Sequence, residues 1–238
     1  MMRLYRGLTV AEADAEIVRQ QILREGLTSS PHGWNCQVVD LRPRLAELLD
    51  KPDLTTADTR PSRKIHHERG WHLELIGGRD AVCACGDDLG AAYYALKHNR
   101  SRDKTAPLLV TFDVDPDQVQ VDGCDFLYNF VFQSGKTPGQ RAAALALFGD
   151  ALGRYLDLAW RSDKMEYRVA LCDLAVQDPD LVSAHLANQT VIGGRYGTVF
   201  RSAFMVPVPV APAQIVSVTV PEPRSFVPEM TIESFRRL

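Results

Sequence analysis

The most basic stretch of the chain, from Arg63 to His72, combines groups that bind phosphate with a ring that stacks on bases. Arg63 and Lys64 supply cations for phosphate oxygens, and Trp71 supplies an aromatic face for a nucleobase. Charged runs are more often solvated surface segments, so a simple exposed loop is the alternative. The residue types therefore indicate either a nucleic-acid contact or a solvated loop at this point of the chain.

Several acidic residues have spacings that could supply a general base or a metal ligand. Asp113 and Asp115 alternate about an expected strand end and could bind a cation, but we expect them to cap a hairpin. Asp122 and Asp125 fall in a glycine-containing turn, and Glu166 begins an expected strand. We expect ordinary turn and surface roles for these carboxylates, and no metal site.

The chain has five cysteines, an odd number at the scattered positions 36, 83, 85, 124 and 172. This usage is typical of reduced thiols in a cytosolic protein. Cys83 and Cys85 are too close for a standard zinc knuckle, and no second pair accompanies them. We therefore predict free thiols and no structural zinc.

Composition limits the classes of protein to consider. With 238 residues and 45% apolar content, the chain can bury one hydrophobic core. A formal charge of −3 provides no general cationic field, so binding to long duplexes is not indicated. No stretch approaches the roughly 18 apolar residues of a membrane helix, and the N-terminus does not resemble a signal peptide. We expect a cytoplasmic protein without a membrane partner.

The first quarter of the chain predicts a strand, a helix and a long excursion. Thr9 and Glu12 form a capping-box pattern, and helical spacing of apolar residues follows. The pattern predicts a strand at Leu4 and a helix over residues 10–25. Residues 27–63 carry polar and Pro-rich stretches and predict a partly ordered segment, of the kind that often covers a binding site.

The rest of the chain mixes short β-like runs with helical ones. Strands are expected at 72–76, 81–85, 108–114, 118–121, 126–132, 166–172 and within 190–220, and helices after Asp87 or Asp88, over 137–160 and over 179–188. This order lacks a βαβ rhythm, so it favours an α+β fold with mostly antiparallel sheets. We expect one domain over residues 1–220 and a C-terminal tail or strap over 221–238.

The order of four short motifs resembles that of ADP-ribosyltransferases. They are Leu4-Tyr5-Arg6-Gly7, Arg24-Glu25-Gly26-Leu27, the strand and helix from Ala84 to Ala95, and Ser202-Ala203-Phe204-Met205-Val206 with the proline-containing turn and strand that follow. The last motif is similar to one in DNA-modifying toxins of the DarT type. The resemblance covers most of residues 3–220 and implies two mostly antiparallel sheets that form an NAD cleft with flanking helices.

The resemblance also implies roles for particular residues. Arg6 would bind the phosphates or a ribose of NAD through its guanidinium fork, and Gly7 would let the backbone approach the cofactor. Tyr5 would lie at the cofactor, Tyr94 would flank the nicotinamide, and Cys85 occupies the place of the family's Ser or Thr.

The acceptor side of the expected site is implied in the same way. Arg201 would contact the acceptor, together with Arg63, Lys64 and Trp71 of the basic stretch. A nucleic acid is favoured slightly over a protein as acceptor. A neutralising antitoxin or immunity protein is a further expected partner.

Position 203 departs from the family pattern, because Ala203 stands where the resemblance expects the catalytic glutamate. That carboxylate would orient the ribose 2′-hydroxyl and stabilise an oxocarbenium-like transition state. Three explanations remain open: an engineered inactivation, a natural pseudoenzyme, or an inward strand residue in a different register.

The sequence therefore leads to three functional hypotheses. The first is an NAD-dependent mono-ADP-ribosyltransferase, a bacterial toxin or defence effector, inactivated at Ala203. The second is a non-catalytic module that binds NAD or ADP-ribose. The third is an NAD glycohydrolase, in which water replaces the macromolecular acceptor.

Overall fold

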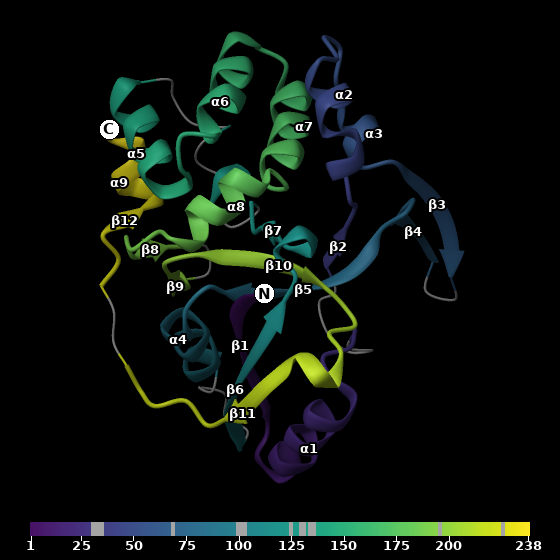
Figure 1. Cartoon of the computed structure of the whole chain (residues 1–238), viewed down its shortest axis with the longest axis vertical. Coiled ribbons are helices and arrows are strands. Elements are labelled where there is room, and N and C mark those ends of the chain that lie inside the picture. The colour runs from purple at the N-terminus through teal and green to yellow at the C-terminus, as the bar shows by residue number, and fades with distance from the viewer. Residues whose placement is uncertain are drawn as a thin grey trace.

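Helices flank an antiparallel sheet in the computed structural model (Figure 1), which confirms the predicted α+β class. The structure describes residues 1–29, 36–67, 70–98, 104–123, 126–128, 132, 137–194, 197–224 and 227–238. Cys124 and Asp125 lie outside these residues, and so does the side chain of Trp71.

The main sheet has seven strands in the order β11-β6-β1-β5-β10-β7, with β2 paired to β5. Their bounds are β1 Met2–Ala11, β2 Cys36–Val38, β5 Arg79–Cys85, β6 Thr105–Val114, β7 Gln120–Val121, β10 Ala203–Pro207 and β11 Ile215–Thr219. Every strand pair in this sheet is antiparallel. The strands come from both ends of the chain, so the sheet joins its first and last parts.

The pairing of β1 with β6 is the longest in the sheet and runs the full ten residues of β1. Leu4 lies opposite Phe112, and both side chains are completely buried. Such directly opposed apolar pairs are the unit of sheet stabilisation. This pairing fixes the position of β1 at the centre of the sheet.

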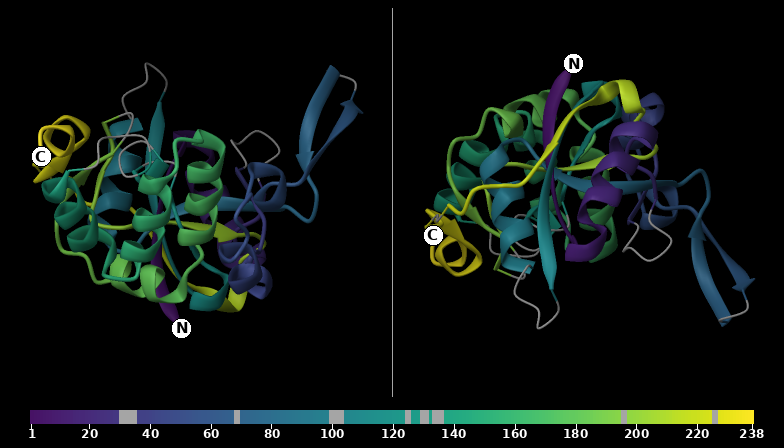
Figure 2. Two further views of the ribbon diagram at one scale, coloured as in Figure 1. Left: turned by 90° about the horizontal axis from the view of Figure 1, so that it is seen from above. Right: turned by 90° about the horizontal axis from the view of Figure 1, so that it is seen from below.

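Two smaller sheets complete the β structure. The first is a hairpin of β3 Ser62–His67 and β4 Gly70–Leu75, which projects from the body of the molecule in both views of Figure 2. The second has three short strands, β8 Ile192–Gly193, β9 Val199–Phe200 and β12 Met230–Thr231. Because β12 and β8 are parallel, this second sheet is mixed, whereas the main sheet is antiparallel throughout.

Nine helices and four short 3-10 segments are present in the described residues. The α-helices are α1 Ala15–Glu25, α2 Leu45–Leu49, α3 Thr56–Thr59, α4 Asp88–His98, α5 Pro138–Phe148, α6 Leu152–Arg161, α7 Met165–Ala175, α8 Pro179–Leu186 and α9 Ile232–Arg236. The 3-10 segments are Glu12–Asp14, Arg42–Arg44, Pro116–Gln118 and Pro212–Gln214. Figure 1 shows α5 to α8 together on one side of the sheet, with α1 near its β11 edge.

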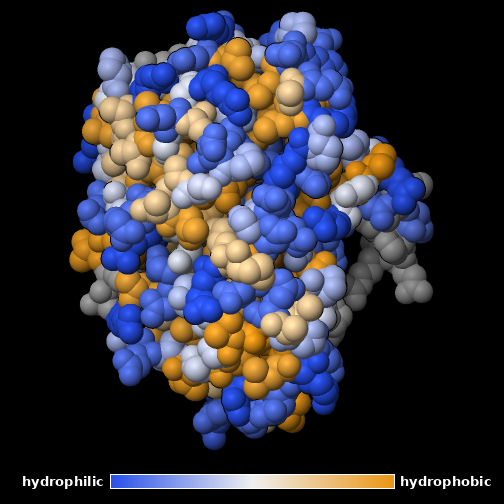
Figure 3. Space-filling model, viewed as in Figure 1, coloured by the Kyte–Doolittle hydropathy of each residue, from blue (hydrophilic) through white to orange (hydrophobic). Residues whose placement is uncertain are grey.

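Exposed apolar side chains lie along the β11 edge of the main sheet. In Figure 3 hydrophobic residues gather in the lower part of the view, where Figure 1 places β11 and α1. Ile17 and Leu23 on α1 and Val216 on β11 are exposed. The edge strand β11 is therefore bordered by apolar surface.

Helix α4 packs directly on β1, and Gly7 makes the close approach possible. A methyl group at Gly7 would lie 2.0 Å from the carbonyl oxygen of Ala91 on the helix. Thr9 donates from its Oγ1 to the carbonyl oxygen of Ala95, one turn further along the helix. Gly7 therefore serves helix packing, and α4 rather than open surface faces it.

The expected helix over residues 10–25 is shorter than predicted, and its expected cap is wrong. Strand β1 continues to Ala11, and the helix begins only at Ala15. Thr9 lies opposite Pro107 in the sheet and uses its hydroxyl on α4. Thr9 does not cap the helix because it is paired in the sheet.

Three other expected elements in the second half of the chain differ from the prediction. The expected helix over 137–160 is two helices, because Gly149 ends α5 with a φ of 82°. Its start is confirmed, since Thr137 and Gln140 form the predicted capping box. The expected strand over 166–172 is helix α7, and residues 126–128 form a helical turn rather than a strand.

Residues 221–238 cross the surface and end in ordered structure. The segment runs along the outside of the molecule in Figures 1 and 2 before β12 pairs with β8. The N-terminus of α9 is capped by Thr231, and its Phe235 is completely buried in the main core. The C-terminal strap is thus fastened to the domain at its far end.

Candidate functional site

Three strands that are distant in the sequence lie side by side in the main sheet: β1, β5 and β10. Tyr5 is the Cα partner of Cys85, and Cys85 is the Cα partner of Ala203. Directly opposed residues on antiparallel strands point to the same face of a sheet. Tyr5, Cys85 and Ala203 therefore form one cross-strand row.

Arg6 lies next to this row and extends to the neighbouring strand. Its Nη1 donates to the carbonyl oxygen of Cys83 at 2.6 Å, and the residue is half-buried. Burial lowers the pKa of Arg6, and the groups of Cys83, Tyr94 and Cys85 act in the opposite direction. Arginine nonetheless stays charged near neutral pH. In the described part of the chain no carboxylate pairs with Arg6, so this cation is available to an anionic ligand.

Tyr94 of helix α4 borders the same surface. Its side chain is 44% exposed and lies near enough to Arg6 to influence the guanidinium electrostatically. The helix that carries it is capped by Asp87, whose Oδ1 accepts from the backbone N–H of Gly90 at 2.8 Å. The predicted start of this helix is therefore confirmed, and it places Tyr94 beside Arg6.

Ala203 is held in place through both of its backbone polar groups. Its N–H donates to Nε2 of His185 at 3.2 Å, and its carbonyl oxygen accepts from the N–H of Asp122 at 2.8 Å. Met205, two residues further on the same face, has its Sδ 3.5 Å from Sγ of Cys83. The Cβ of residue 203 thus belongs to the sheet face that carries Cys85 and Cys83.

His185 supports position 203 from the helical side of the sheet. Because Nε2 accepts a hydrogen bond from Ala203, the proton of the neutral ring is on Nδ1, 3.1 Å from the carbonyl oxygen of Leu147. The ring stacks on Phe148 with a centroid distance of 4.5 Å and also contacts Phe204. The sequence contained no signal for this role, since His185 reads as one polar residue in a short amphipathic helix.

Stability should fall at mildly acidic pH because His185 is buried in its neutral form. Burial lowers the pKa of His185 from 6.5 to about 4, so between these values the unfolded chain binds more protons than the folded one. The stabilisation present near pH 7 is therefore lost as the pH falls through this window. We expect a loss of about 2 kcal/mol between pH 7 and pH 5, measured by urea denaturation.

A His185→Gln variant is the matched control for this pH dependence. It lacks the titrating ring, so the difference between its free energies of unfolding at pH 7 and pH 5 should be smaller by the same amount. An equal pH dependence in the two proteins would contradict the assignment. Asp173 is buried too and its raised pKa acts in the opposite direction, but both proteins contain it.

Asp122 is an acidic residue beside the row to which the sequence assigned only a turn role. Besides its bond to Ala203, its charge raises the pKa of both Cys36 and Cys83, which places the carboxylate near these thiols. The expected turn is present, but the turn also delivers a carboxylate to the site. Its position directly after the short strand β7 was the available signal.

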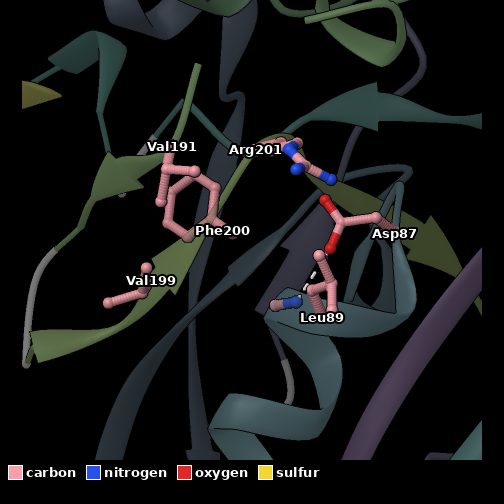
Figure 4. A pocket seen from close by; sticks show the side chains of 7 residues that line it. Asp87, Leu89, Val191, Val199, Phe200 and Arg201 are labelled. Carbon is pink, nitrogen blue, oxygen red and sulfur yellow. Dashed lines mark hydrogen bonds between the residues drawn. The ribbon is translucent and has the colours of Figure 1, made fainter. Parts of the chain in front are cut away.

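A small hollow lies at the start of helix α4, next to the row. It has about 150 Å³ of non-protein space, open solvent included, and is lined by Asp87, Leu89, Gly90, Val191, Val199, Phe200 and Arg201. Figure 4 shows the guanidinium of Arg201 directed towards the carboxylate of Asp87, and Nε of Arg201 donates to the carbonyl oxygen of Gln189 at 3.1 Å. Ligand pockets usually exceed about 300 Å³, so a dinucleotide would have to extend beyond this hollow.

The basic stretch is not beside the row. Arg63 and Lys64 lie on β3 of the projecting hairpin, where Arg63 pairs with Glu74 at 2.6 Å and Lys64 is exposed. The backbone of Trp71 lies on β4, opposite His66. The alternative of a solvated loop is wrong, because the segment is a paired hairpin. Its residues reach outward from the domain instead of joining Arg6.

A buried carboxylate anchors the base of this hairpin. Asp173 on α7 accepts from Thr59 Oγ1 at 2.7 Å, from Nε and Nη2 of Arg60 at 2.8 and 2.6 Å, and from the hydroxyl of Tyr128. Burial nevertheless raises the pKa of Asp173, since desolvation outweighs the contributions of Arg60 and Thr59. Strand β3 begins at Ser62, so the network fixes the point where the hairpin leaves the domain.

The described residues contain neither a metal-binding cluster nor a membrane-spanning helix. No group of three or more His, Cys, Asp or Glu side chains is arranged to hold a metal ion. None of the helices described has the length and apolar character needed to cross a membrane.

The chain was also compared with known proteins. No family model, no curated protein and no solved structure matches it.

Proposed function

We propose that this chain is an NAD-dependent mono-ADP-ribosyltransferase that Ala203 leaves able to bind NAD but poorly able to use it. One observation carries the proposal: Tyr5, Cys85 and Ala203 form a row across adjacent strands, and beside it lies Arg6, with which no carboxylate of the described residues is paired. The motif order implied these residues as a site, and β1, β5 and β10 are neighbours although almost 200 residues separate the first from the last.

In this proposal NAD lies over the row, beside Arg6 and Tyr94. The guanidinium of Arg6 binds the diphosphate or a ribose, a task for which its planar set of donors is suited. Tyr94, exposed on α4, flanks the nicotinamide ring. The hollow between Asp87 and Arg201 is continuous with this region through Gly90, whose Cβ position would be 3.1 Å from Sγ of Cys85.

The reaction transfers ADP-ribose from nicotinamide to a nucleophile. The bond between C1′ and the nicotinamide nitrogen breaks with its electron pair leaving on nicotinamide, and an acceptor lone pair forms the new bond to C1′ and loses its proton. A carboxylate at position 203 would stabilise the cationic transition state, and alanine cannot. Asp122, whose backbone N–H donates to the carbonyl oxygen of Ala203, adjoins this position.

The hairpin β3–β4 supplies the contact to the acceptor, and a nucleic acid fits it best. Lys64 is exposed on strand β3 of this hairpin. The preceding residue, Arg63, forms an ion pair with Glu74 at the surface. Phosphate oxygens can compete for such an exposed pair because surface ion pairs are weak. Arg201 would contact the acceptor at the hollow. An antitoxin or immunity protein would be expected to cover the same face.

Ala203 specifically favours a second candidate function. A chain with a formed ligand row and no catalytic carboxylate is what an NAD-binding or ADP-ribose-binding pseudoenzyme requires. Turnover of NAD after a carboxylate is restored separates the two, and turnover without any macromolecular acceptor would indicate an NAD glycohydrolase.

NAD should stabilise the unmodified protein, and Arg6→Ala should abolish the effect. At a concentration one hundred times its Kd, a ligand that binds only the folded state stabilises it by about 2.7 kcal/mol. We expect a rise in Tm with NAD for the parent chain and a much smaller one for Arg6→Ala, measured by thermal denaturation.

Arg24→Ala is the control for this experiment. Its side chain is 73% exposed on α1, so it removes the same charge away from the row. This variant should keep the full response to NAD. Equal responses from Arg6→Ala and the parent chain, or no response from the parent, would contradict the proposed binding mode.

A further inference from the structure

Strands β2 and β5 bring two thiols together within electrostatic reach of Arg6. Cys36 is the Cα partner of Ala81, and Cys83 lies two residues further along β5, so the two cysteines form a diagonal cross-strand pair. Each thiol is the strongest influence on the pKa of the other, and both residues are solvent-exposed. The two accessible thiols are therefore close neighbours.

The two thiols differ in reactivity because their surroundings differ. The interaction with Cys83 lowers the pKa of Cys36 to about 7, helped by the Arg6 guanidinium and opposed by burial and by Asp122. The same interaction and burial raise the pKa of Cys83 well above its ordinary value. Thiolate is the reactive form, so Cys36 is suited to attack and Cys83 to resolve.

We propose that Cys36 and Cys83 form a redox-active dithiol that a hydroperoxide converts into a disulfide. This modification site is independent of the proposed NAD chemistry, since it needs only the pairing of β2 with β5. The three-residue strand β2 pairs with β5 alone in the described sheet, and the disulfide requires the two Cβ atoms to come within about 4 Å of each other.

The oxidation proceeds in two balanced steps. The Cys36 thiolate attacks the peroxide, an S–O bond forms as the O–O bond breaks, and the leaving alkoxide or hydroxide takes up a proton. Cys83 then loses its proton and attacks the Cys36 sulfenic acid; the S–S bond forms, the S–O bond breaks and water leaves. The two thiols are together oxidised by two electrons, and the hydroperoxide is reduced to an alcohol or water.

Oxidation would change the candidate site because Cys83 is part of its wall. The carbonyl oxygen of Cys83 accepts the hydrogen bond of Arg6, and its Sγ contacts Met205. A disulfide would draw this side chain towards β2 and remove the thiolate that faces Arg6. The environment of the guanidinium would therefore report the redox state.

The experiment treats the reduced full chain with equimolar hydrogen peroxide at pH 7 and maps the products by mass spectrometry. We expect a Cys36–Cys83 disulfide that dithiothreitol reverses, and a Cys83→Ser variant that accumulates a sulfenic acid at Cys36, trapped by dimedone. The Cys36→Ser variant should consume peroxide at least about tenfold more slowly than the parent chain. The reason is that an ordinary thiol is only a few per cent thiolate at this pH.

Cys172→Ser is the control, since this buried thiol on α7 is distant in the fold from β2. It should react like the parent chain. A disulfide between other cysteines, no disulfide in the parent chain, or an unchanged rate in Cys36→Ser would overturn the proposal. Mapping in the parent chain needs no variant to fold, so it decides the matter even where a substitution destabilises the protein.

Discussion

Replacing Ala203 with glutamate is expected to raise the rate of nicotinamide release from NAD by a hundredfold to a thousandfold or more. The estimate of about 10²–10³ is the usual effect of one group that stabilises charge in a transition state. Position 203 is well placed for such a group, because its backbone is held by His185 and Asp122 and its Cβ shares a face with Cys85. The measurement is nicotinamide release with DNA, with RNA, with protein lysate and with no acceptor.

The matched control for this experiment is Ala203→Gln. Glutamine has nearly the shape of glutamate but no charge, so this variant should remain at the level of the alanine chain. A glutamate variant that folds, binds NAD and releases no more nicotinamide than the glutamine variant would show that position 203 is not catalytic. If the chain derives from a toxin, expression of Ala203→Glu from a promoter that is tightly repressed until induction should also arrest growth of the host.

Replacing Asp173 with alanine is expected to destabilise the protein by about 3 kcal/mol, the lower end of the usual cost of breaking a buried ion pair. Asp173 is 5% exposed and accepts hydrogen bonds from Thr59, Arg60 and Tyr128. All three donors would lose this acceptor. The lower end applies because Arg60 is 42% exposed and can turn towards water. Urea denaturation of the two proteins measures the difference.

Asp163→Ala controls for the loss of a carboxylate as such. Asp163 is fully exposed and only 3.8 Å from Nη2 of Arg168, and exposed ion pairs contribute little to stability. Its urea midpoint should stay at the parent value. A midpoint for Asp173→Ala that is no lower than that of Asp163→Ala would mean that the network at the base of the hairpin is not stabilising.

Local patterns predicted those elements whose start or end is set by a few neighbouring residues. Thr137 with Gln140, Asp87 and the proline at position 179 each begin a helix as expected. The errors arose where distant contacts decide the outcome. Thr9 was taken as a helix cap but pairs in the sheet, and Gly149 ends a helix whose apolar pattern continues on the next one.

Helix α7 shows why a short apolar run cannot be assigned from periodicity. Its residues from Ala170 to Ala175 are all buried, so the segment lacks the polar face that identifies an amphipathic helix. A buried strand would give the same pattern. Only the packing of α7 against α6 and α3 decides between the two.

The resemblance named Tyr5, Cys85 and Ala203 as site residues but not their arrangement. The register that aligns these residues depends on sheet pairing, which the motif order does not specify. The carboxylate of Asp122 and the support from His185 depend on chain segments that meet only in the folded protein. The hairpin position of Lys64, away from the row, could not be predicted for the same reason.

A crystal structure of the unmodified chain with saturating NAD would show directly whether NAD binds at Arg6. We expect a diphosphate or ribose oxygen about 3 Å from the Arg6 guanidinium, with the nicotinamide ribose next to the Cβ of Ala203. An empty sheet face, or NAD bound at a site that does not include Arg6, would contradict it.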